Sequence, residues 1–152
     1  MKALRETIAA LGVLFTIAVV AMHYAELPRR IPIHFNALGV ANGWGDKSSL
    51  WLLAGVTCVL YLMLTLVRFL PQSLINLPVG PDRRAAAMPI AMEMIDWLKA
   101  EMVWIFAALI WAVVAVAQGR NAGLSVWFLP VTLVAVFGTI AFYIVRMMRV
   151  RA

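Results

Sequence analysis

The residues of this chain best suited to chemistry lie together at 27–47, a stretch that reads LPRRIPIHFNALGVANGWGDK. His34, Phe35 and Asn36 stand at its centre. An imidazole can bind a metal ion, relay a proton or contact a ligand, and His34 and Asn36 can equally hydrogen-bond the backbone and hold the loop in shape. The only other histidine is His23, and a two-histidine site needs further ligands. We therefore expect no metal here and keep the structural and ligand-contact roles open.

The flanking residues favour an ordered loop that meets a partner. Pro28 and Pro32 restrict the backbone to extended conformations, while the glycines that follow mark tight turns. The adjacent arginines at 29–30 can meet anionic headgroups or an acidic partner, or can serve as solvated anchors. The residues that we expect to contact a ligand or partner are His34, Phe35, Asn36, Gly39, Gly43, Trp44, Gly45, Arg29 and Arg30.

No motif typical of an enzyme accompanies this loop. The sequence has no G-x-S-x-G, H-E-x-x-H, Walker loop or G-x-G-x-x-G. Cys58, the single cysteine, lies within an apolar run, where a thiol usually packs as a small hydrophobic group. We expect no catalytic residue, no cofactor and no enzymatic activity.

The elements that must position this loop are membrane helices. Hydrophobic residues make up 64% of the 152 residues and charged residues 13%, about half the charged share of a soluble domain. Four runs between charged residues are long and apolar enough to cross a bilayer, and apolar residues on all sides favour helices over outer-membrane strands. We predict an all-α integral membrane four-helix bundle in one domain, with spans at about 7–25, 48–67, 102–119 and 124–145.

The distribution of lysine and arginine predicts the topology. Four spans place both termini and the connection at 68–101 on one side of the membrane, together with nine basic residues against four on the other. The side richer in basic residues is normally cytoplasmic. Both termini are therefore expected in the cytoplasm, with the ordered loop at 26–47 outside the cell or in the periplasm. We expect the first helix to be retained rather than cleaved as a signal peptide.

The second half of the cytoplasmic connection has helical periodicity and is predicted to run directly into the third span. Glu93, Asp96 and Lys99 fall on its polar side, where Asp96 and Lys99 can pair at i,i+3. Glu101 lies at the predicted edge of the bilayer, where it can turn toward water or pair with Lys99 or Arg68. Within the spans themselves we expect no pair of acids, which argues against a pore or pump.

Twelve positions of the loop resemble a known signature. The pattern LP-x-x-IP-x-HFN-x-x-G-x-x-x-GWG-x-K, from Leu27 to Lys47, is similar to that of a bacterial membrane family of unknown function. It also stands at the start of SdpI-type immunity proteins, which protect cells against a sporulation-delaying toxin. Where this chain has Asn42, the family more often has aspartate. The resemblance implies a four-helix membrane domain, here a short form without the further spans of full-length SdpI-type proteins.

Three functions are compatible with the sequence. We expect a membrane binding or interaction protein of the SdpI-like type that uses the HFN loop to meet a partner, a peptide or a lipid. The alternatives are an accessory subunit of a larger membrane complex and a small transporter or membrane enzyme. The expected surroundings are the lipid bilayer of the cell (inner) membrane and a membrane protein partner or second copy. Nucleic acid is not expected, because the basic residues form no common face.

Overall fold

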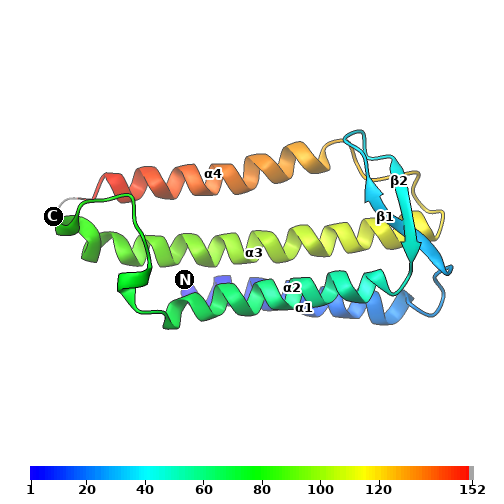
Figure 1. Cartoon of the computed structure of the whole chain (residues 1–152), viewed down its shortest axis with the longest axis horizontal. Helices are drawn as coiled ribbons and strands as arrows, with labels where there is room; N and C mark the ends of the chain where they lie inside the picture. The colour runs from blue at the N-terminus through cyan, green and yellow to red at the C-terminus, as the bar shows by residue number, and fades with distance from the viewer. Residues whose placement is uncertain (151–152) are drawn as a thin grey trace.

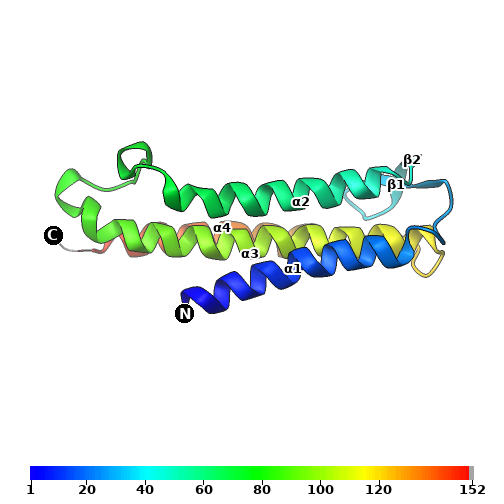
Figure 2. The same cartoon turned by 90° about the horizontal axis from the view of Figure 1, so that it is seen from below.

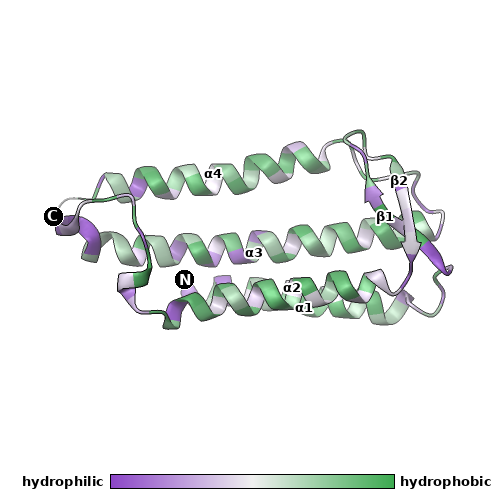
Figure 3. Ribbon diagram, viewed as in Figure 1, coloured by the Kyte–Doolittle hydropathy of each residue, from purple (hydrophilic) through white to green (hydrophobic). Residues whose placement is uncertain are grey.

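The computed structural model describes residues 1–150 and contains four long helices. Each helix is long and apolar enough to cross a membrane, and apolar residues predominate in all four (Figure 3). The expected four-helix membrane fold is confirmed, and the chain is a multi-pass membrane protein. The helices are α1 (Lys2–His23), α2 (Ser49–Leu66), α3 (Arg84–Ala117) and α4 (Phe128–Met148).

The helices run along one long axis, and the two ends of the bundle differ (Figure 1). A two-stranded sheet lies at one end, which we call the hairpin end. Both termini lie toward the other, which we call the termini end. The α2–α3 connection also lies there and contains three single turns of 3₁₀ helix at Val67–Phe69, Gln72–Leu74 and Pro81–Arg83.

Helix α3 is the centre of the bundle, because it packs against each of the other three helices. Its 34 residues extend over about 50 Å, which is well beyond the roughly 30 Å of a hydrocarbon core. The helix begins at Arg84, so residues 84–101 are helical and continue into the predicted third span, as the periodicity indicated.

Helix α4 is the least enclosed helix. It packs mainly against α3, and only 6% of the residues in its apolar window are buried within the protein. Its exposed side chains are large and apolar, as at Val134 and Phe137. Lipid is therefore the expected neighbour of most of its surface.

The loop between α1 and α2 forms an antiparallel hairpin across the hairpin end of the bundle (Figure 1). Strand β1 (Arg30–Phe35) pairs with β2 (Ala41–Asp46). The register is irregular on both sides of His34, so the pairing is bulged at the centre of the HFN sequence. Ile31 belongs to the hydrophobic core beneath, together with Val20, Leu50 and Val114. The ordered loop that the sequence predicted is thus packed onto the ends of the helices.

Candidate functional site

Asn36 closes the turn of the hairpin. Its Oδ1 accepts hydrogen bonds from the backbone N–H groups of Leu38 (3.0 Å) and Val40 (2.9 Å), and its own N–H donates to the carbonyl of Val40 (2.9 Å). An asparagine side chain that mimics a backbone turn in this way fixes a tight loop. Its Nδ2 amide makes no hydrogen bond within residues 1–150, and Asn36 as a whole is exposed.

His34 spans the two strands. Its Nδ1 lies 2.5 Å from Oδ1 of Asn42, and because that oxygen only accepts, Nδ1 must donate. Nε2 of the neutral ring is then left as an acceptor, with no partner in residues 1–150. Gly43 leaves room for this side chain, since a Cβ there would lie 2.9 Å from Cβ of His34.

Gly39 docks the hairpin onto the loop between α3 and α4. Its carbonyl accepts a hydrogen bond from the N–H of Leu124 (2.8 Å), and the next residue, Val40, forms a bridge with Gly123. Gly39 has φ +78°, and a Cβ would lie 1.9 Å from the carbonyl oxygen of Leu124. Only glycine fits this left-handed and crowded position.

A lysine ties the second strand to the end of α1. Nζ of Lys47 donates to the carbonyls of Tyr24 (3.0 Å) and Leu27 (3.2 Å) and lies 4.8 Å from the centre of the Tyr24 ring. Next to it, the backbone N–H of Ser48 donates to Asp46 and lowers the pKa of that carboxyl. These contacts fix the point at which the hairpin enters α2.

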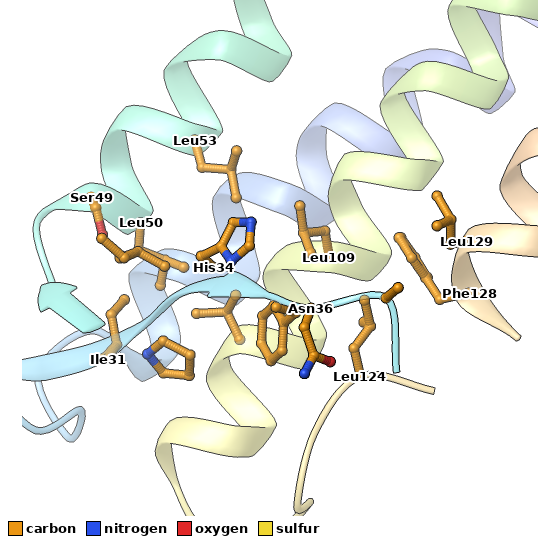
Figure 4. Close-up of a pocket in the computed structure, with 15 residues that line it drawn as sticks. Ile31, His34, Asn36, Ser49, Leu50, Leu53, Leu109, Leu124, Phe128 and Leu129 are labelled. Carbon is orange, nitrogen blue, oxygen red and sulfur yellow. The ribbon is translucent and has the colours of Figure 1, made fainter. Parts of the chain in front are cut away.

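The hairpin covers a cavity of about 560 Å³ between the helices. This volume is within the range of small-molecule sites, roughly 300–1,000 Å³. Figure 4 shows Leu53, Leu109 and Phe128 converging from α2, α3 and α4 on one side of strand β1. Most of the lining is apolar, and its polar side chains, His34, Asn36 and Ser49, come from the hairpin and the start of α2. The cavity is therefore an apolar space with a few polar groups on the side of the hairpin.

The structure brings together some of the residues that the sequence predicted and separates others. His34, Phe35 and Asn36 line the cavity, and Gly39 fixes the roof above it. Gly43 and Gly45 lie in β2 as neighbours of His34 and Ile33, where each leaves space for the opposite side chain.

The arginines and the tryptophan of the predicted set lie outside the cavity lining. Trp44 is 48% exposed, Arg30 donates to its carbonyl, and Arg29 lies 3.8 Å from Asp46 in an exposed ion pair. The walls from α3 and α4, such as Leu109 and Phe128, were not predicted, because nothing in the local sequence indicates that α4 lies beside the hairpin.

Comparison with known proteins identifies part of this region. Residues 11–58 match a domain of unknown function, DUF1648. The match covers most of α1, the whole hairpin and the first half of α2, while α3 and α4 lie outside it. No curated protein and no solved structure matches the chain. The matched region thus includes the roof and one wall of the cavity.

A second polar cluster lies at the termini end, inside the bundle. Asp96 of α3 is 2% exposed and lies between Arg5 and Arg68. Nη2 of Arg68 donates to its Oδ1, and Nε of Arg5 lies 3.5 Å from its Oδ2 without hydrogen-bond geometry. Helix α1 diverges from α3 toward the N-terminus (Figure 2), and the long Arg5 side chain reaches back across that separation to Glu93, at 3.0 Å.

Lys99 continues the cluster deeper in the bundle and is fully buried. Its Nζ donates to Oε2 of Glu6 (2.6 Å) and to the hydroxyl of Thr65 (3.1 Å) and lies 5.1 Å from the ring centre of Tyr61. The prediction that Asp96 pairs with Lys99 is therefore wrong, because each finds a partner on another helix.

Glu101 also differs from the prediction. It pairs with neither Lys99 nor Arg68, and instead Oγ1 of Thr139 on α4 donates to its Oε1, while its buried Oε2 has no hydrogen-bond partner.

Proposed function

We propose that this protein is a membrane binding protein of the SdpI-like type, without enzymatic activity. It holds an apolar ligand in the cavity beneath the hairpin of β1 and β2, which we call the HFN hairpin after His34, Phe35 and Asn36. The observation that carries the proposal is the cavity itself, about 560 Å³ with apolar walls from three helices and few polar groups, which come from the hairpin and the start of α2. A site of this kind suits a ligand with an apolar body and a small polar head.

His34 indicates the chemistry of that head. Its ring lies on the same side of β1 as Leu53 and Leu109 (Figure 4), and its Nε2 acceptor has no partner within residues 1–150. Arg29 and Arg30 do not line the cavity. A neutral acceptor without a neighbouring cation fits an uncharged group such as a hydroxyl or an amide better than a phosphate, which needs several donors. The ligand class is therefore a lipid-like molecule with an uncharged polar head.

The orientation of the chain completes the proposal. The excess of lysine and arginine at the termini end supports cytoplasmic termini in a bacterial inner membrane. The hairpin then faces outward, and the cavity takes its ligand from the outer leaflet. The SdpI-like assignment rests on the HFN signature at 27–47, and the DUF1648 match covers the same segment without giving it a function.

Filling the cavity tests the proposal. The purified protein is expected to release a lipid-like molecule, enriched over the bulk lipid, on organic extraction and mass spectrometry. Leu53 lines the cavity and Leu52 does not, and Leu52 is 71% exposed on the outside of α2. Leu53→Trp is expected to lower the amount of this molecule at least about tenfold, since the larger ring occupies its volume, and Leu52→Trp is expected to retain it.

Two results would reject the assignment. One is an extract from the unchanged protein that contains only bulk lipid in bulk proportions. The other is an equal loss of the molecule in both tryptophan variants, which would mean that the cavity has no special role. A peptide in the extract, in place of a lipid, would replace the proposed ligand class by a toxin-like one.

A further inference from the structure

A second cavity lies at the opposite end of the molecule. It has a volume of about 540 Å³ and shares no lining residue with the cavity beneath the hairpin. One wall is Ile90 of α3. The remaining lining residues come from α4 and the residues after it, namely Ala141, Phe142, Val145, Arg146, Arg149 and Val150.

Along α4, the residues that line this cavity change from apolar to charged toward the C-terminal end of the helix. Ala141, Val145 and Arg149 follow one another at intervals of four residues and so lie on one face of the helix. Residues 128–145 contain no charge, and Arg146 and Arg149 come in the last turn and at the C-cap. The apolar part of the cavity therefore lies at the depth of acyl chains, and the two guanidinium groups lie at the depth of lipid headgroups.

The two arginines keep donors free for a ligand. The side chain of Arg149 makes no hydrogen bond or ion pair within residues 1–150. Arg146 donates through Nη1 to Glu93 (2.9 Å), but this carboxylate also binds Arg5, and the Arg146 side chain stays 47% exposed. One carboxylate shared by two arginines leaves a net positive charge at the mouth of the cavity.

We propose that this cavity is a binding site for a phospholipid with an anionic headgroup. The phosphate lies against Arg146 and Arg149, and one acyl chain packs on Ile90, Phe142 and Val145. Arginine suits this role because its planar guanidinium group donates two parallel hydrogen bonds to phosphate oxygens. Basic pockets between transmembrane helices bind anionic headgroups through the same combination of charge and apolar contact.

Native mass spectrometry of the full chain in detergent tests this proposal. The protein is titrated with phosphatidylglycerol and, separately, with phosphatidylcholine of the same acyl chains. We expect the unchanged protein to prefer phosphatidylglycerol. Arg149→Gln is expected to weaken phosphatidylglycerol binding about fivefold, and Arg146→Gln/Arg149→Gln to remove the preference. Ala141→Trp, which fills the apolar part, is expected to weaken the binding of both lipids.

The control removes the same charge elsewhere. Arg120→Gln, at an exposed arginine after α3 at the hairpin end, is expected to leave the preference unchanged. The single Arg149→Gln variant is decisive if the double variant does not fold, because Arg149 takes no part in the ion pairs of the bundle. Equal affinity of the unchanged protein for the two lipids would overturn the proposal. So would an unchanged preference in Arg149→Gln, or an equal loss in the hairpin-end control.

Discussion

Asp96→Ala is expected to destabilise the folded protein by about 3–5 kcal/mol, because it removes the carboxylate between two largely buried arginines and leaves Arg68 without its ion-pair partner. Asp96 is 2% exposed, and the side chains of Arg5 and Arg68 that face it are 9% and 19% exposed. Water can replace the lost carboxylate only poorly at such a site. The free energy of unfolding, measured by titration with a denaturing detergent in mixed micelles, gives the size of the effect.

A second aspartate provides the matched control. Asp82 pairs with Arg83 at 3.8 Å, but its side chain is 64% exposed. Asp82→Ala is therefore expected to change the free energy of unfolding by less than about 1 kcal/mol. A loss for Asp96→Ala that is no larger than the loss for Asp82→Ala would contradict the assignment of a buried and coupled charge cluster at the termini end.

Gly39→Ala is expected to release the hairpin from the loop between α3 and α4, with a loss of about 2–4 kcal/mol in local stability. The added Cβ would lie 1.9 Å from the carbonyl oxygen of Leu124, so the two backbones must separate and break the hydrogen bond from Leu124 to Gly39. The broken bond and the left-handed φ each cost about 1–2 kcal/mol. Hydrogen exchange at the amide of Leu124, which donates to the carbonyl of Gly39, reports the release directly.

Gly119 separates the cost of the left-handed φ from the cost of the broken hydrogen bond. It also has a positive φ, +69°, but a Cβ added there would meet no neighbouring atom within 4 Å. Gly119→Ala is expected to lose only about 1 kcal/mol and to keep the amide of Leu124 protected. If Gly39→Ala exchanges no faster than Gly119→Ala at Leu124, the hairpin is not held by this contact.

The helices and the ordered loop were predictable because their signals are local. Four apolar runs of bilayer length indicate four spans whatever lies between them. Pro28, Pro32 and the glycines of the loop indicate an extended segment followed by tight turns. The strand register was not predictable, because the pairing of β1 with β2 is bulged around His34.

The charge cluster and the walls of the cavity could not be predicted because their partners are distant in sequence. Arg5 and Glu93 are 88 residues apart, and Glu6 and Lys99 are 93 residues apart. A charge in a single sequence indicates contact with water unless a counter-ion is known, so Asp96 and Lys99 were assigned to a polar face. The cavity likewise depends on the position of α4, which no residue of the loop specifies.

A ligand in the cavity beneath the HFN hairpin can be captured in native membranes by photo-crosslinking, with p-benzoylphenylalanine in place of one phenylalanine of α4 at a time. Phe128 lines the cavity, whereas Phe137 is 63% exposed on the outside of the same helix. We predict one discrete adduct from position 128 and a mixture of bulk lipids from position 137. The same mixture from both positions would show that the cavity holds no ligand of its own.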